Sequence, residues 1–357
     1  MSVAIPSTVS WSASDLKGPR LLEAINTVVP NALGGIKPIV ATVLTLGLYV
    51  KGMASQDWLL MAQQIGQHHP SRIVVINPAD PTGEPRLDAS ISATLTQRRP
   101  TDIPTLFSEC VELNLKGGLA THWIDLIQPL IRPGVPAYLW WMGLPPLTGF
   151  RWDLLSTTGF THLVVDTETR DWRAWLPLLR DAVAHHMRVD DLNWQRLADL
   201  RQHWAQLGDH AVGISVLMRV QTIDITWNTE SPTHWVWWLA WIASRFGWTL
   251  VLNDAQIPVA MNTENGSVPV TMQKGATATA RLIADDREIR TVMTKERLVT
   301  HILQQNHPLY HLDDLRITTT VQNDMLQILN RGHDVLFQEA LSCLLSVTES
   351  VGGERHA

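Results

Sequence analysis

Two adjacent tryptophans, Trp140 and Trp141, end a short apolar run whose composition is typical of a β-strand. Neighbouring side chains on a strand point to opposite faces of the sheet, so these two indole rings must find two different environments. One ring can lie in a core, whereas the other requires a second layer, a ligand or a partner. No nucleophile, metal-binding cluster or phosphate-binding loop adjoins the pair in the sequence. The run therefore favours a binding protein over an enzyme.

The length of the chain, 357 residues, exceeds what one hydrophobic core usually serves and predicts two domains. Strand-like runs alternate with stretches of helical periodicity in both halves. The predicted fold class is mixed α/β (α+β), with two α/β domains that each hold a mixed or mostly antiparallel sheet and packed helices. The predicted parts are an N-terminal arm (1–37), an N-terminal α/β domain (38–188), a connecting helix (189–209) and a C-terminal α/β domain that ends in a helix (210–357).

The second half carries several local signals. Residues 190–208 predict one helix, capped by Asp190 or Asp191, and residues 212–220 predict a strand. Ser231 and Pro232 predict the start of an almost wholly apolar helix that Gly247 ends. Residues 296–305 and 324–346 predict two more helices, the second interrupted by Gly332. The halves share a rough order of elements, which fits either an old duplication or two independent α/β layers.

Composition excludes several classes of partner. The net charge of the chain is −6. Nucleic acids and anionic membranes bind positively charged surfaces, so this charge argues against both as partners. The longest apolar runs, 39–50 and 235–243, are too short to span a bilayer. The two cysteines, Cys110 and Cys343, cannot build a disulfide framework, and the N-terminus does not resemble a signal peptide. We therefore expect a cytoplasmic protein.

Catalytic motifs are missing from the sequence. It contains no dinucleotide fingerprint, no P-loop and no nucleophile elbow. The histidines lack the spacing of a metal site, and adjacent carboxylates such as Asp285 and Asp286 are explained by caps and turns. Cys110 lies on a predicted strand without a nearby activating base. We expect no catalytic residue, no metal site and no cofactor.

Six segments in order along the chain resemble the patterns of one family: Pro70–Asp80, Ser108–Leu113, Pro129–Gly143, Leu163–Thr167, Asp191–Leu197 and Trp241–Trp248. The third is similar to the family's P-L-L-x-P-D-L-P-x-x-x-W-W, the fifth matches D-L-x-W-x-R-L, and the sixth resembles W-L-A-S-R-L-G-W. The family is that of the OpcA-type glucose-6-phosphate dehydrogenase assembly proteins of cyanobacteria and actinobacteria. The resemblance covers roughly residues 38–250, with a weaker C-terminal part.

The resemblance implies a non-enzymatic partner of glucose-6-phosphate dehydrogenase in the oxidative pentose phosphate pathway, which promotes the active oligomer of that enzyme. Cyanobacterial members are also linked to thioredoxin-dependent control, for which Cys110 and Cys343 are the candidate redox residues. The 16 tryptophans suit a protein interface. The candidate partner-binding residues are Trp140, Trp141, Met142, Trp235, Trp237, Trp238 and Trp241, and core packing is the competing reading for each tryptophan. The alternative function is a small-molecule sensor or an enzyme that uses an α/β cleft.

Overall fold

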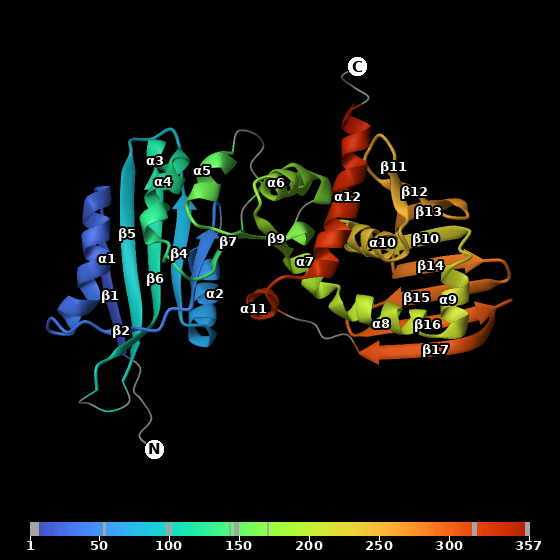
Figure 1. The fold of residues 1–357 in the computed structure, drawn as a ribbon, viewed down its shortest axis with the longest axis horizontal. Helices are drawn as coiled ribbons and strands as arrows, with labels where there is room; N and C mark the ends of the chain where they lie inside the picture. The colour runs from blue at the N-terminus through green and yellow to red at the C-terminus, as the bar shows by residue number, and fades with distance from the viewer. Residues whose placement is uncertain are drawn as a thin grey trace. The chain divides into compact units, whose positions relative to one another are not determined.

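The computed structural model describes residues 7–52, 55–97, 99, 102–142, 144–145, 150–169, 171–315 and 320–353. The chain divides into two compact units, the first made of residues 1–165 and 181–189 and the second of residues 166–180 and 190–357 (Figure 1). Each unit holds a β-sheet with helices packed on it, which confirms the predicted fold class. The residue boundaries predicted for the domains stay predictions.

The first sheet has nine strands among the described residues, in the order β1-β5-β6-β4-β3-β7-β8-β9, with β2 paired to the start of β6. Strands β6, β4, β3, β7 and β8 run parallel, whereas β5 and β1 are antiparallel to their neighbours. The bounds are β1 Ser7–Ala13, β2 Ile39–Val40, β3 Leu44–Tyr49, β4 Ser71–Pro78, β5 Arg86–Thr96, β6 Thr105–Lys116, β7 Ala137–Trp141, β8 His162–Val165 and β9 Arg188–Asp191.

Helices cover both faces of this sheet. Val29 of α1 packs on Ala93, Leu95 and Leu106, which lie on one face. Gly66 of α2 lies against Ser108 on the opposite face, so the alternation of side chains along the strands places α1 and α2 on different sides. The bounds are α1 Gly18–Ala32, α2 Ser55–His68, α3 Gly118–Thr121, α4 Trp123–Ile127, η1 Gln128–Leu130 and α5 Trp152–Thr157. The described part of the predicted arm thus supplies β1 and α1 to the first unit.

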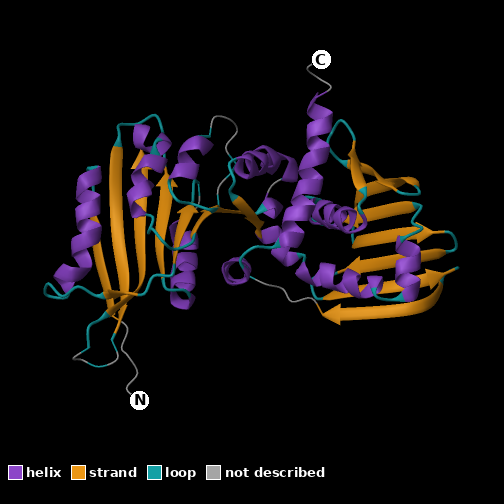
Figure 2. Cartoon of the chain, in the orientation of Figure 1, coloured by secondary structure: helices purple, strands orange, loops and turns teal. Residues whose placement is uncertain are grey.

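The second sheet has eight strands among the described residues, in the order β11-β12-β13-β10-β14-β15-β16-β17. Figure 2 shows the strands in orange and the helices in purple. All neighbours are antiparallel except β10 and β13, which are parallel. The bounds are β10 Thr222–Trp227, β11 Thr249–Leu252, β12 Pro258–Thr263, β13 Gly266–Lys274, β14 Ala278–Ala284, β15 Arg287–Met293, β16 Arg297–Gln304 and β17 His307–Leu315. The two sheets differ in strand order and direction, which favours independent layers over an old duplication.

The apolar helix predicted after Pro232 is α10, Thr233–Phe246, and it is buried at every position from Thr233 to Ala243. Gly247 ends it with φ 66°, a conformation that glycine adopts without strain. The other helices of the chain are η2 Thr167–Thr169, α6 Trp172–Ala184, α7 Leu192–Arg196, α8 Ala198–Gly208, α9 Ala211–Leu217, α11 Val321–Arg331 and α12 Val335–Gly353. Among the described residues, no helix combines the length and the apolar character that crossing a bilayer requires.

The single helix predicted over residues 190–208 was wrong. Residues up to Asp191 are extended in β9, and the Asp191 carboxylate then accepts a hydrogen bond from the Asn193 backbone N–H, which caps α7. Leu197 separates α7 from α8. The aspartate was read correctly as a cap, but it caps a helix that begins later and is shorter.

Two further predictions had the wrong periodicity. Residues 212–217 of this segment belong to α9 rather than to a strand, with Gly213, Val216 and Leu217 buried at the i, i+3, i+4 spacing of one helix face. Residues 296–305 contain the strand β16 rather than a helix, with Leu298, Thr300 and Ile302 buried at every second position. In both segments the short apolar run fits the period of a helix and that of a strand. Tertiary packing selected the structure that the sequence did not predict.

Candidate functional site

The strand order of the first unit defines one crevice where a ligand would be expected. The parallel strands β4 and β6 lie on one side of β3 and the strands β7 and β8 on the other, so the order reverses between β3 and β7. Open α/β sheets bind ligands at that point, outside the carboxyl ends of the strands. Tyr49 ends β3 and Trp141 ends β7, and the Met142 N–H donates a 2.9 Å hydrogen bond to the Tyr49 carbonyl.

Aromatic side chains fill this crevice. The rings of Tyr49 and Trp141 are stacked with centroids 4.0 Å apart. Trp123 lies 5.4 Å from Tyr49, and Phe150 meets Trp141 edge-on at 5.1 Å. The Trp141 Nε1–H donates to the Leu144 carbonyl at 2.9 Å, and burial raises the pKa of Tyr49 to about 12. The rings therefore pack together at the carboxyl ends of β3 and β7, next to the point where sheets of this topology bind a ligand.

The other candidate tryptophans also lie in cores. Trp140 is 1% exposed, and the four of α10 are at most 7% exposed, whereas Met142 is half-buried. Trp140, Trp141 and Met142 belong to the first unit and Trp235, Trp237, Trp238 and Trp241 to the second. In this conformation these indole rings are packed inside the cores of their units and offer little surface to a partner. Partner binding through these seven residues stays a prediction.

A buried polar cluster in the second unit was missed at the level of sequence. Both oxygens of Asp191 accept hydrogen bonds: Oδ1 from the backbone N–H groups of Thr167 (3.1 Å) and Asn193 (3.0 Å), and Oδ2 from the Thr167 hydroxyl (2.5 Å). The Thr167 oxygen in turn accepts from Trp237 Nε1 at 2.9 Å. Burial raises the pKa of Asp191 to about 7, although these hydrogen bonds act to lower it. Asp191 is 0% exposed, so no substrate reaches this carboxylate.

Arg196, one turn further along, holds three carboxylates together. It donates to Asp166 and Glu168 at 2.8 and 2.7 Å and to Asp324 at 3.1 Å. These partners come from the segment around η2 and from α11, so the guanidinium joins parts of the second unit that are far apart in sequence. Arg196 therefore has a structural role, which is to link these segments through ion pairs.

Several residues of these clusters lie in the six sequence segments that resemble the family patterns. The segment Leu163–Thr167 meets Asp191–Leu197 through Thr167 and Asp191. In the first unit, Pro70–Asp80 meets Ser108–Leu113 through Arg72 and Glu109. The sequence segments mark both partners of each contact but do not indicate which segment meets which.

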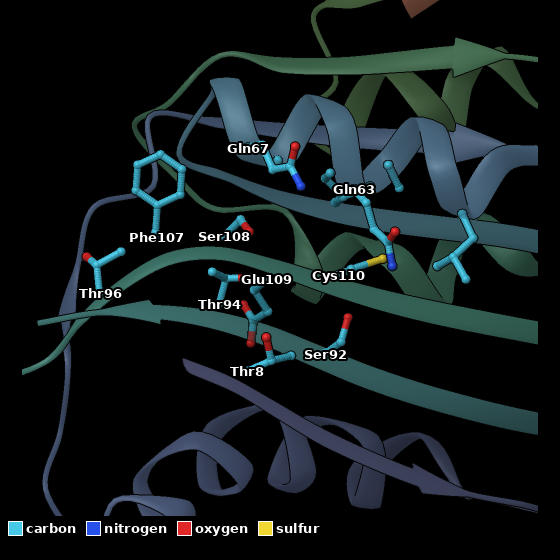
Figure 3. Close-up of a pocket in the computed structure, with 14 residues that line it drawn as sticks. Thr8, Gln63, Gln67, Ser92, Thr94, Thr96, Phe107, Ser108, Glu109 and Cys110 are labelled. Atoms are coloured by element: carbon cyan, nitrogen blue, oxygen red, sulfur yellow. The ribbon is translucent and has the colours of Figure 1, made fainter. Parts of the chain in front are cut away.

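The two cysteines are free thiols, Cys110 in the first unit and Cys343 in the second. Cys110 lies on β6, at the wall of a pocket beneath α2 (Figure 3). Burial, together with the nearby carboxylates of Glu112 and Glu109, raises the pKa of Cys110 to about 12. Burial also raises the pKa of Cys343. Both environments disfavour the reactive thiolate, and the redox role of the two residues stays a prediction.

We expect Cys110 to resist alkylation in the native chain. A pKa near 12 leaves roughly a thousandfold less thiolate at neutral pH than an ordinary cysteine has. Iodoacetamide labelling of the Cys343→Ser variant, followed by mass spectrometry, measures this rate, which should rise about tenfold with each pH unit below that pKa. The same variant unfolded in urea is the reference. A native rate within tenfold of the unfolded rate at neutral pH contradicts the expected thiol environment.

Two family models match this chain. Residues 62–172 match the model of the glucose-6-phosphate dehydrogenase subunit N-terminal domain, and residues 187–341 match the model of its C-terminal domain, both of the OpcA type. The chain belongs to the OpcA family. This confirms the resemblance found in the sequence segments.

Curated OpcA relatives are longer than this chain. A protein of Nostoc punctiforme is 24% identical over 212 residues, which are 59% of this chain and 43% of that protein. A protein of Synechococcus elongatus is 24% identical over 211 residues, 58% of this chain and 44% of that protein. Both carry the provisional name OxPP cycle protein OpcA. The chain therefore matches less than half the length of these relatives.

Solved structures outside the family resemble the chain only distantly. UDP-N-acetylglucosamine 3-dehydrogenase from Acidithiobacillus ferrooxidans has a TM-score of 0.44 and 11% identity, covering 85% of this chain and 95% of that one. Biliverdin reductase from Synechocystis, with biliverdin and NADP+, has a TM-score of 0.44 and 11% identity over 87% and 98% of the two chains. Likenesses at this level carry no inference about function.

Proposed function

We propose that this chain is a non-enzymatic assembly factor that binds glucose-6-phosphate dehydrogenase and favours its active oligomer in the oxidative pentose phosphate pathway. The observation that carries the proposal is the match to both domain models of the dehydrogenase-assembly family, in order along the chain. The names of the curated relatives support the same pathway. A cytoplasmic location and control by thioredoxin belong to this proposal as well.

The aromatic crevice supports a role without a dinucleotide. The stacked rings of Tyr49 and Trp141, with Trp123 and Phe150 around them, occupy the space at the reversal of strand order. The buried Asp191, the carboxylate whose pKa best suits a general base, is enclosed by its own hydrogen-bond partners. An assembly factor needs neither a cofactor crevice nor an accessible base.

An activator acts by binding the active form of an enzyme more tightly than the inactive form. Converting a mostly inactive dehydrogenase to a mostly active one requires a difference of about 5.5 kcal/mol between the two affinities. Interfaces supply such energies through a few well-packed side chains at their centre.

Exposed aliphatic side chains in the first unit provide the docking surface in this proposal. Five of them, 46–57% exposed, surround β2: Ile36, Ile39, Val40, Val43 and Ile103. The Ile39 N–H donates to the Pro104 carbonyl at 2.9 Å, which holds the 36–43 segment beside Ile103. Ile39 and Val40 point to opposite sides of β2, and both are exposed. A partner that contacts both would therefore enclose this short strand from two sides. Clustered exposed apolar residues of this kind mark protein-binding sites.

The test adds the purified chain to glucose-6-phosphate dehydrogenase and follows turnover, apparent substrate affinity and the oligomeric state of the enzyme by light scattering. We expect at least one of the three to change. Ile39→Ser with Val40→Ser should weaken the effect about tenfold or more, because interface anchors contribute about 1–2 kcal/mol each. Their exposure predicts a change of only about 0.5 kcal/mol in folding stability.

Two control variants separate the surfaces. Leu309→Ser replaces a comparably exposed aliphatic residue of the second unit, 46% exposed, and should leave binding unchanged. Trp140→Ala should lower the unfolding free energy by about 3–5 kcal/mol, as expected for a core ring. A Trp140→Ala chain that folds normally but no longer binds would place the interface at the tryptophans instead. No change in turnover, affinity or oligomer on adding the wild-type chain would refute the proposed function.

A further inference from the structure

The first unit contains a pocket of about 480 Å³ between α2 and the outer strands of its sheet (Figure 3). This volume lies within the range of small-molecule sites. The floor is formed by β5 and β6, with β1 beyond them, and one wall is the face of α2 that carries Gly66. A Cβ at Gly66 would lie 3.2 Å from the Ser108 hydroxyl, so glycine allows the helix to approach the sheet this closely.

Hydroxyl and carboxamide groups converge on this pocket. Thr8, Thr94 and Ser108 are in register on three neighbouring strands, so their side chains form one row across the sheet. Ser92 lies two residues further along β5, on the same face of the sheet. Gln63 and Gln67 face this row from α2, because residues four apart share a helix face. Within the described part of the chain, none of these six side chains hydrogen-bonds to another residue, so all of them can serve a ligand.

The pocket provides no positive charge to a ligand. None of its described lining residues is lysine, arginine or histidine. The one carboxylate in the lining, Glu109, already accepts from Arg72 Nε at 2.8 Å and lies 3.5 Å from Arg132. A phosphate or carboxylate would enter without a charged donor, which makes its loss of hydration unfavourable. The chemistry therefore selects an uncharged ligand.

Apolar side chains complete the lining. Phe107, half-buried at the start of β6, and Leu59 and Ile73 present carbon surface beside the hydroxyl row. A sugar ring has the matching character, with hydroxyl groups around its edge and C–H groups on its faces. We propose that this pocket binds an uncharged polyhydroxylated compound of monosaccharide to disaccharide size. The lining of this pocket shares no residue with the exposed aliphatic surface around β2, and the proposal does not depend on the dehydrogenase.

Cys110 gives the test a local readout, because it lines the pocket while Cys343 lies in the other unit. Uncharged N-ethylmaleimide is applied at alkaline pH, and modification of each cysteine is followed by mass spectrometry in glucose, mannitol, trehalose or glucose 6-phosphate. We expect at least one uncharged probe to slow modification of Cys110 severalfold and to leave Cys343 unchanged. Glucose 6-phosphate at the same concentration should protect less than glucose.

Two variants locate the effect. Thr94→Val keeps the shape of the side chain and removes its hydroxyl, and Gln67→Leu removes a carboxamide. Each should weaken protection about two- to tenfold, the effect of one lost hydrogen bond. Thr279→Val, at a half-buried position on β14 of the other unit, is the matched control and should change nothing. The proposal is overturned if no uncharged probe protects Cys110, if glucose 6-phosphate protects as well as glucose, or if neither pocket variant weakens protection.

Discussion

Replacing Asp191 by alanine is expected to lower the unfolding free energy of the second unit by about 3–5 kcal/mol. The change removes the acceptor of two backbone N–H groups and one hydroxyl, all in a region that water does not reach. A buried donor without a partner costs about 1–3 kcal/mol, and the cap of α7 is lost at the same time. Urea unfolding followed by a probe in the second unit measures the effect.

The pH dependence of stability gives an independent measure of the same carboxylate. Its pKa is about 7 in the folded chain, against 3.8 for an ordinary aspartate. Between these values the folded state binds more protons than the unfolded state, so this group makes stability fall as pH rises from 4 to 7, by about 4 kcal/mol in total. Above pH 7 its contribution is constant.

Two variants serve as controls for Asp191. Asp191→Asn cannot titrate, so this part of the pH dependence should vanish. Asp209→Ala, at the exposed end of α8, should change stability by no more than about 0.5 kcal/mol. If Asp191→Ala were as stable as Asp209→Ala, the buried cluster would not hold this unit together.

The second large effect is expected in the first unit, where Glu109→Ala should destabilise the fold by about 3–5 kcal/mol. Glu109 is 2% exposed and accepts from Arg72, which also donates to the Leu130 carbonyl at 3.1 Å. Arg132 lies 3.5 Å away on the other side, and burial together with Arg72 lowers its pKa. Without the carboxylate, two guanidinium groups would share a largely buried space with no counter-charge.

Thermal unfolding of Glu109→Ala and Glu112→Gln provides the comparison. Glu112 lies on the same strand but on the opposite face, half-buried, where Ser90 and Asn114 donate to it. Its replacement keeps a hydrogen-bonding group and should have a much smaller effect. Equal melting temperatures for the two variants would show that the buried ion pair contributes little.

The sequence predicted the fold where one pattern allowed only one structure. The strand with Trp140 and Trp141, and the helix between Pro232 and Gly247, carry signals of composition or capping that fit a single element. Residues 212–220 and 296–305 were read with the wrong period, because a short apolar run fits both a helix and a buried strand. Only the packing of Val216 and Leu217 on one helix face, and of Leu298, Thr300 and Ile302 on one strand face, decides between them.

The polar clusters and the pocket were beyond what spacing along the chain can indicate. Thr167 and Asp191 are 24 residues apart, and Arg72 and Glu109 are 37 apart, so each pair is joined by the fold alone. The polar lining of the pocket is serine and threonine from β1, β5 and β6 and glutamine from α2, and these residue types at these positions form no recognisable sequence motif. The sequence did predict correctly that Trp140 and Trp141 need two environments, but both environments lie within the chain.

The aromatic rings at the end of β3 and β7 also limit how this chain can evolve. Gaining a dinucleotide site there would require a glycine-rich turn after β3 and an empty crevice above it. Emptying the crevice means removing rings that support one another, and each removal costs about 3–5 kcal/mol. Proteins have only about 5–15 kcal/mol of stability in total. Each such substitution would therefore remove a large part of the stability available to the first unit, which makes these rings hard to replace one at a time.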